Sequence, residues 1–188
     1  MNTDYRHNLK NVSLLRTEMA GAAFMITLGS LLHFVFDWCG GWMPIALIAA
    51  VNESIWEHLK LVFWPGVLWA AIMPVGADLA RRDVFAAKGI SLLVSAVLIV
   101  LIFSAYTAIL GGNLLVLDIG TFVFSILMGQ LFSAWLVARD DGWRRGLFLP
   151  GLVLFGLQLA AYSLLTYFPP DHWLFVEAHS GLTGIVAR

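Results

Sequence analysis

The stretch Asn52-Glu53-Ser54-Ile55-Trp56-Glu57-His58-Leu59-Lys60 interrupts a chain that is otherwise apolar enough to lie in lipid. It holds two carboxylates, a hydroxyl, an imidazole and an ammonium within nine residues. Residues three or four apart share a face of a helix, so these side chains can all reach one flank. Ionisable groups near a membrane interior are costly, and they are usually retained for a function and kept away from lipid.

Two interpretations of this stretch compete, and both can hold. Ser-x-x-Glu before an apolar run is the signature of a helical capping box, with Ser54 as the cap and Glu57 as its partner. Lys60 then simply pairs with a glutamate. Alternatively the stretch carries chemistry. Its candidate catalytic residues are Glu53, Ser54, Glu57 and Lys60, and its candidate metal ligand is His58. Capping alone leaves Glu53 and His58 unexplained, so we favour a functional role for the cluster.

The composition indicates a polytopic membrane protein. The chain has 188 residues, of which 60% are hydrophobic and 12% charged, whereas soluble domains carry about 25% charged residues. A formal net charge of −1 gives no reason to expect a nucleic-acid partner. The single cysteine, Cys39, excludes an intrachain disulfide and a multi-cysteine metal site. The first apolar run is long and lacks a small-residue cleavage site, so we expect no cleavable signal peptide.

The apolar runs predict an all-α polytopic membrane helix bundle that forms one unit over residues 1–188. Several runs reach the roughly 20 residues that a bilayer-crossing helix needs. Residues 43–80 are too long for one crossing, so we break them near Asn52, and we expect Pro65 and Pro74 to kink the second span. The predicted spans are about 17–37, 53–78, 84–110, 115–138 and 146–168, with a short interfacial or re-entrant helix at 43–51 and an outer tail at 169–188.

Basic residues orient this five-span arrangement. Nine of the 11 lysines and arginines fall on one side of it. They are Arg6, Lys10, Arg16, Arg81, Arg82, Lys88, Arg139, Arg144 and Arg145. By the positive-inside rule the N-terminus is cytoplasmic and the C-terminus outside, in the cell inner (plasma) membrane.

On this topology, four of the five histidines and six of the 12 acidic residues gather in the outer layer, which is net negative and attracts cations. His33 and Asp37 are four residues apart and can bind one ion. Together with His58 they give a nitrogen and oxygen site that suits zinc or another divalent metal, with one position left for water. The metal would make a nucleophile of that water, and Glu53 or Glu57 would be the general base.

Each of these residues also has a simpler interpretation. His33 taken alone suits a hydrogen-bonded histidine near the interface, and Asp37 suits a solvated carboxylate at a helix end. His172 is a further candidate ligand, but it lies with His179 in a polar tail, where a histidine is usually solvated. The convergence of residues from separate helices is what favours a metal site.

The whole chain resembles an uncharacterised family of prokaryotic multi-span membrane proteins, a domain of unknown function. The central resemblance is Asn52-Glu53-Ser54-Ile55-Trp56-Glu57-His58-Leu59-Lys60-Leu61 followed by Phe63-Trp64-Pro65. His33-Phe34 matches a motif at the end of the first span. The closing motif is matched by Pro169-Pro170, Leu174-Phe175 and Gly181-Leu182-Thr183-Gly184-Ile185. Ala178-His179 stands where an Asp-Pro pair is common, which weakens a role for His179. The resemblance implies no established activity.

A fainter resemblance is to the membrane hydrolases that include alkaline ceramidases and adiponectin receptors. Ser54 and His58 are similar to the Ser-x-x-x-His pair of their sites, and His172 and His179 are loosely similar to their C-terminal histidines. Those proteins have seven spans and a His-x-x-x-His pair that this chain lacks.

We therefore predict a metal-dependent membrane hydrolase that acts on a lipid or lipid-linked substrate at the outer leaflet. One alternative is a proton-coupled transporter with Glu53, Glu57 and Lys60 as a relay. It requires polar residues toward the cytoplasmic side, where the spans offer little beyond Gln130, Gln158 and hydroxyls. Another is an accessory subunit that binds haem through His33 and His58.

Overall fold

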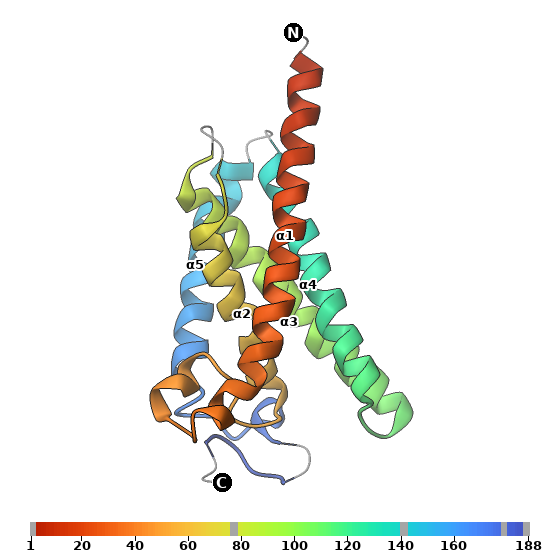
Figure 1. The fold of residues 1–188 in the computed structure, drawn as a ribbon, viewed down its shortest axis with the longest axis vertical. Coiled ribbons are helices and arrows are strands. Elements are labelled where there is room, and N and C mark those ends of the chain that lie inside the picture. Colours follow the sequence, from red (N-terminus) through yellow and green to blue (C-terminus); the bar gives the residue numbers. More distant parts are fainter. Residues whose placement is uncertain (1–2, 76–78, 140–142, 178–179, 186–188) are drawn as a thin grey trace.

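In the residues that the structure describes, the protein is a bundle of five α-helices that follow one another along the chain (Figure 1). The computed structural model describes residues 3–75, 79–139, 143–177 and 180–185. The helices are α1 (Thr3–Trp38), α2 (Ile55–Ile72), α3 (Arg81–Leu110), α4 (Leu115–Ala138) and α5 (Trp143–Leu164). Two 3-10 turns, η1 (Met43–Leu47) and η2 (Trp173–Phe175), lie in the connections. The described residues contain no strand, only an isolated bridge between Val176 and Thr183.

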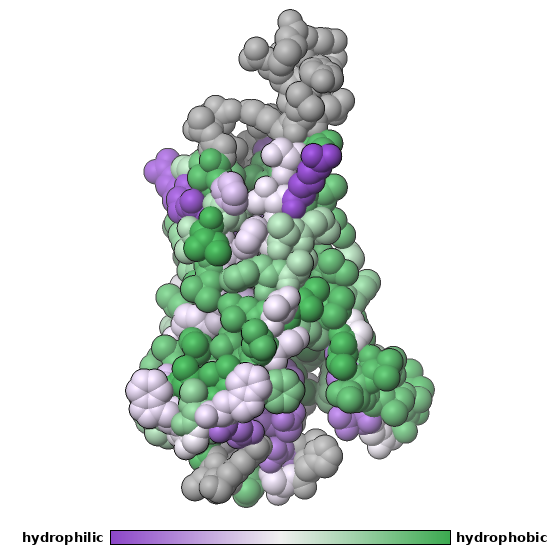
Figure 2. All heavy atoms as spheres, in the orientation of Figure 1, coloured by the Kyte–Doolittle hydropathy of each residue, from purple (hydrophilic) through white to green (hydrophobic). Residues whose placement is uncertain are grey.

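The helices run up and down the long axis, so that the two termini lie at opposite ends (Figure 1). Helix α1 packs against α2 and α4, and α3 packs against α2, α4 and α5. The η1 segment and the C-terminal tail gather at the end that holds the C-terminus, where the α3–α4 hairpin leans away from the other helices. A hollow between the hairpin and the main bundle is visible at this end in Figure 2, which also shows the apolar surface of the bundle's middle.

Four helical segments are long and apolar enough to cross a membrane: Val12–Trp38, Arg81–Leu110, Leu115–Ala138 and Gly146–Leu164. Helix α2 is not among them. Half of its residues are buried by the other elements, including Glu57 and Lys60. A helix whose surface is covered by protein can carry polar groups that a lipid-facing helix cannot. The all-helical prediction and the membrane helices are thus confirmed, whereas the second predicted span, 53–78, is not among the candidate spans of the described residues.

The predicted bounds differ from the observed ones for local reasons. Helix α2 is shorter than the predicted span of 53–78, because Met73 already has an extended backbone (φ −56°, ψ 141°), as expected before a proline. Pro74 therefore follows the helix instead of kinking it, while Pro65 lies inside it. The predicted interfacial helix of 43–51 is limited to the five residues of η1. Helix α4 matches its predicted bounds of 115–138.

Close helix contacts depend on glycine. A Cβ atom on Gly89 of α3 would lie 2.0 Å from the Gly151 carbonyl oxygen of α5, and one on Gly29 of α1 would lie 2.4 Å from the Leu61 carbonyl oxygen of α2. Small residues allow membrane helices to approach backbone to backbone. The contact at Gly29 brings the end of α1 against α2.

Candidate metal centre

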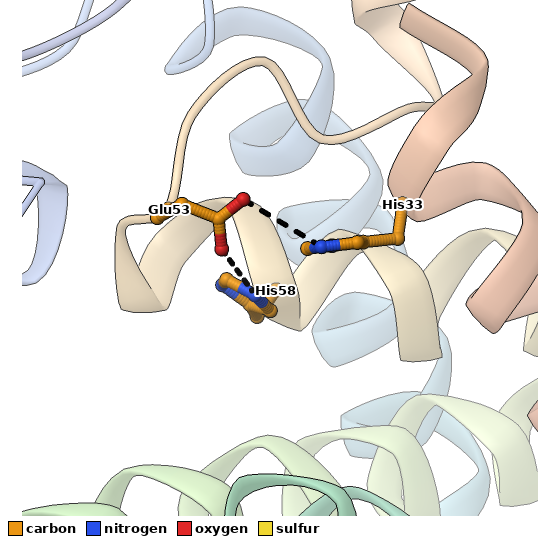
Figure 3. Close-up of side chains that lie close together, drawn as sticks. All are labelled: His33, Glu53 and His58. Carbon is orange, nitrogen blue, oxygen red and sulfur yellow. Dashed lines mark ion pairs between the residues drawn. The ribbon is translucent and has the colours of Figure 1, made fainter. Parts of the chain in front are cut away.

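The residue at which α2 begins determines which residues of the stretch Asn52–Lys60 face α1. Ser54 is the N-cap: its backbone is extended, and its Oγ accepts a hydrogen bond from the Glu57 backbone N–H at 3.4 Å. Glu53 therefore precedes the helix and is not four residues from Glu57 along a helical face. Its side chain turns toward His58 on α2 and His33 on α1 (Figure 3).

The three side chains form a compact group of potential ligands. The Glu53 carboxylate oxygens lie 3.6 Å from His33 Nε2 and 3.4 Å from His58 Nε2, and one ligand atom from each residue lies within 4.8 Å of the other two. Ligands bound tetrahedrally to zinc at about 2.0–2.1 Å are about 3.3–3.4 Å apart. The group is thus close to the spacing that a metal ion requires. The side chains are 25% to 47% exposed, so an ion and a substrate can reach them.

The hydrogen bond at one ring nitrogen of His58 determines how the other ring nitrogen can interact. Nδ1 lies 2.8 Å from the Ser54 carbonyl oxygen, which can only accept, so Nδ1 carries the proton. In the neutral imidazole, Nε2 then has a lone pair directed toward a carboxylate oxygen of Glu53. Two lone pairs repel each other unless a proton or a metal ion lies between them. A backbone carbonyl that holds the remote nitrogen is also the usual support of a metal-binding histidine.

The group lies on one wall of an otherwise apolar pocket of about 430 Å³. Residues of α1, α2, α3 and α4 line it, and most of the wall is aliphatic or aromatic, including Phe34, Ile99, Phe103, Leu115 and Phe122. Pockets of this size that combine apolar walls with few polar groups are typical of small-molecule sites. The pocket suits a molecule with a hydrocarbon part and a polar part.

A second polar group faces this pocket from the α3–α4 turn. Asp118 and Asn113 both line it. The Asp118 carboxylate accepts hydrogen bonds from Asn113 Nδ2 at 3.0 Å and from the Tyr106 hydroxyl. The sequence places Asp118 in the outer layer but does not single it out as a site residue. The sequence pattern that could have identified Asp118 is a carboxylate in the first turn of an apolar helix.

The predicted catalytic residues Glu57 and Lys60 form a separate, buried network. Lys60 Nζ lies 2.6 Å from Glu57 Oε2 and donates to the Ala46 carbonyl oxygen at 2.7 Å. Glu57 also accepts from the Val51 N–H at 3.1 Å and from Thr166 Oγ1 at 3.0 Å. These contacts join the segment before α2, which contains Ala46 and Val51, to Thr166, which follows α5. The structure therefore brings Glu57 and Lys60 together with each other and not with the three ligands, and their catalytic role stays a prediction.

The other predicted ligands lie outside the group. Asp37 is exposed one turn beyond His33. His172 is exposed in the tail, where its Nδ1 accepts a hydrogen bond from the Leu174 N–H at 3.3 Å and caps η2. His179 lies outside the described residues. Of the four predicted metal ligands, the group contains His33 and His58, and the third member is Glu53, which the sequence suggests as a general base.

The tail covers the central stretch on its other side. The Glu53 backbone N–H donates to Glu177 at 3.3 Å, and Asn52 Nδ2 donates to the Gly184 carbonyl oxygen at 2.9 Å. Phe175 stacks on Trp56 with ring centroids 4.6 Å apart. The tail thus holds the loop that carries Glu53 without closing the pocket, whose lining contains no tail residue among those described.

A second charged group lies within the helices, and the sequence analysis does not find it. Glu18 of α1 and Lys88 of α3 are fully buried and 2.6 Å apart. Both stand near the ends of apolar runs, where the sequence suggests solvated lead-in and loop residues. Gln130 of α4 is buried and accepts from Lys88 Nζ at 2.6 Å.

Apolar helices and a potential metal-ligand group facing an apolar pocket define the class: a helical protein with membrane-spanning segments and a weak candidate metal site. The chain belongs to the "Family of unknown function (DUF6512)", whose pattern matches residues 8–185. No curated protein and no solved structure matches the chain. The expected membership of an uncharacterised family is thereby confirmed, and the family adds no activity.

Proposed function

We propose that His33, Glu53 and His58 hold a divalent metal ion, and that the protein is a hydrolase of a lipid or lipid-linked substrate. The observation that carries this proposal is the grouping of the three residues, with His58 Nε2 facing Glu53 and His58 Nδ1 held by the Ser54 carbonyl oxygen. Two histidines and one glutamate are a common ligand set of catalytic zinc, with the fourth position open to water. Zinc lowers the pKa of such a water to about 7.

The pocket supports a lipid as substrate. Its apolar wall would take a hydrocarbon chain, and the metal group and Asp118 would face the polar part. Asp118 lines the same pocket as the ligands and accepts two hydrogen bonds, so it is a better candidate for the general base than Glu57, which is paired with Lys60. A general base has to be within hydrogen-bond reach of the proton that it removes, directly or through one water.

We propose the orientation that the basic residues predict, with the N-terminus cytoplasmic and the pocket at the outer face of the inner (plasma) membrane. The helices alternate in direction along the bundle (Figure 1). Helix α2 leads the chain from the pocket end of the bundle to the end where α3 begins. We therefore propose that α2 crosses the membrane as a fifth helix, covered by the other helices.

Haem is a poorer fit to the same histidines. The ring centroids of His33 and His58 are 5.2 Å apart, and the Glu53 carboxylate lies against both Nε2 atoms. An ion fits between these three groups, whereas a macrocycle between the imidazoles would have to displace Glu53.

Elemental analysis of the purified protein tests the metal site. We expect zinc, iron or manganese to copurify, or to bind on addition, in proportion to protein. His58→Ala should lose the metal, while His172→Ala, a change of an exposed tail histidine, should keep it. A folded wild-type protein that neither contains nor binds a divalent metal would overturn the proposal.

Hydrolysis is tested separately, by incubating metal-loaded protein with vesicles of mixed phospholipids, ceramide and lipid-linked sugars and analysing the products. The proposal expects a cleaved lipid that is absent with chelator and with His58→Ala. Metal binding without cleavage of any of these would leave the site as a metal-binding site and remove the hydrolase.

A further inference from the structure

Charged and amide side chains from three helices meet inside the bundle, away from the pocket. Besides Lys88, the Glu18 carboxylate accepts from Ser133 Oγ at 2.8 Å, and the Glu18 carbonyl oxygen accepts from Gln130 Nε2 at 3.3 Å. All four side chains are at most 1% exposed, and they come from α1, α3 and α4, which each contain a candidate membrane span. Ionisable groups in such segments are rare, and proton relays and ion pathways are among the functions that they mark.

Lys88 is not fully satisfied as an ammonium. An ammonium has three donor hydrogens, and Lys88 Nζ has two acceptors within the described part of the chain, Glu18 Oε2 and Gln130 Oε1. A neutral amine has only two donor hydrogens, so these two acceptors would satisfy it. The group therefore suits either of two proton positions, an ion pair or an uncharged acid beside an uncharged amine. Such a pair can move a proton between Lys88 and Glu18 without leaving a net charge inside the bundle.

Polar residues connect this group with the pocket along one stripe of α4. Counted from the pocket, they follow each other in steps of three or four residues, which keeps them on one helix face. The stripe consists of the polar residues Asp118, Thr121, Ser125 and Ser133, with Gly129 between the last two. At 1.5 Å per residue it is about 22 Å long, which is most of the roughly 30 Å of a bilayer's hydrocarbon core.

Helix α3 adds hydroxyls that face this stripe. Ser95 Oγ donates to the Ser91 carbonyl oxygen at 3.2 Å, and both serines are 1% exposed. A Cβ atom on Gly129 would lie only 1.9 Å from Ser95 Oγ, so the α3 hydroxyl occupies the place of a side chain on α4. The hydroxyls of the two helices thus share one buried interface between the Glu18–Lys88 pair and the pocket.

Two polar atoms beside this interface have no hydrogen-bond partner. Ser125 is fully buried and its Oγ is unpartnered, as is the buried Nε1 of Trp69. The Trp69 nitrogen and Gln130 Nε2 both approach Gly21, within 2.3 Å and 2.4 Å of the position of a Cβ atom there. Buried polar groups are nearly always hydrogen-bonded to protein or water. Unpartnered groups along a row of hydroxyls suit a chain of water molecules that relays protons.

We infer that the protein conducts protons across the membrane, along the α3–α4 stripe between the pocket and the Glu18–Lys88 pair. A proton from the pocket passes along hydroxyls and water to the Glu18 carboxylate and forms its O–H bond, while the Lys88 ammonium releases a proton from an N–H bond on the far side. The proton then moves from Glu18 to Lys88, which breaks the O–H bond, forms an N–H bond and restores the ion pair. Asp118, which lines the pocket, lies at the pocket end of the stripe. The inference does not depend on a bound metal.

The test is proton flux into phospholipid vesicles that contain the purified protein and a trapped pH-sensitive dye, driven by a potassium diffusion potential set with valinomycin. We expect wild-type flux above that of protein-free vesicles. Ser125→Val should reduce it to the protein-free rate, since it fills the stripe without removing a charge. Ser104→Val is the matched control, because Ser104 also has a buried unpartnered hydroxyl on a helix but lies off the stripe.

The ion pair is tested by Glu18→Gln together with Lys88→Met, because removing both charges avoids the burial of an unpaired one. The inference expects a folded protein, judged by a single gel-filtration peak, without flux. Flux that persists in this variant and in Ser125→Val would overturn it, as would a wild type no faster than protein-free vesicles. If the double variant fails to fold, the comparison of proton flux in Ser125→Val with that in Ser104→Val still tests the inference.

Discussion

At the scale of single residues, the candidate metal centre depends on the protonation of two imidazoles. Metal binding requires neutral histidine, whose ordinary pKa is about 6.5. We therefore expect the purified protein to hold its metal near pH 7.5 and to release it as the pH falls below about 6, since protons then compete for Nε2. Dialysis at stepped pH followed by elemental analysis measures this. Metal that stays bound at pH 4.5 would mean that His33 and His58 are not the ligands.

Ser54 is one residue for which the capping interpretation makes a clear prediction. Its Oγ accepts from the Glu57 N–H, and removing such a cap costs about 1 kcal/mol. Ser54→Ala should lower the free energy of unfolding by that amount and leave metal content unchanged, while Ser54→Thr should restore stability. Denaturant unfolding in detergent measures the first effect. If Ser54→Ala abolishes activity in a stable, metal-loaded protein, Ser54 takes part in the chemistry.

At the scale of elements, the Glu57–Lys60 pair holds α2 to the segments around it. Breaking a buried ion pair on one side costs about 3–5 kcal/mol, because a charge is left uncompensated. Glu57→Gln should therefore destabilise the protein by that order, and Lys60→Met in addition should recover much of the loss. Thermal unfolding of the single and double variants measures the coupling. Equal stability of Glu57→Gln and the wild type would contradict this role.

The contact between α3 and α5 depends on the absence of a side chain at Gly89, whose Cβ would lie 2.0 Å from a backbone oxygen. Gly89→Ala should push the helices apart and cost about 1–3 kcal/mol, as overpacking does. Gly156→Ala is the control, because the space at Gly156 in α5 is open and alanine favours a helix. Thermal unfolding compares them, and a Gly89→Ala protein as stable as Gly156→Ala would show that the helices adjust freely.

At the scale of the whole molecule, the sequence predicts the helices better than the site. The lengths of the apolar runs are sufficient to find α1, α3, α4 and α5, because a bilayer selects for such runs. It is harder to predict where the helix begins within the stretch Asn52–Lys60. Glu53 and Glu57 share a flank only if both are helical, and the cap at Ser54 leaves Glu53 outside the helix. The Glu18–Lys88 pair depends on how α1 and α3 pack, which no local pattern in either helix contains.

The single cysteine tests the orientation of the whole bundle in the membrane. Cys39 is exposed just after α1, at the end of the bundle that holds the pocket. With a cytoplasmic N-terminus, a membrane-impermeant maleimide should label Cys39 in intact cells. Arg82→Cys in a Cys39→Ser background places the only thiol at an exposed position on the opposite end. It should react only after the membrane is opened. The reverse pattern would put the pocket and its ligands on the cytoplasmic side, so the proposed hydrolase would then act on lipids of the inner leaflet.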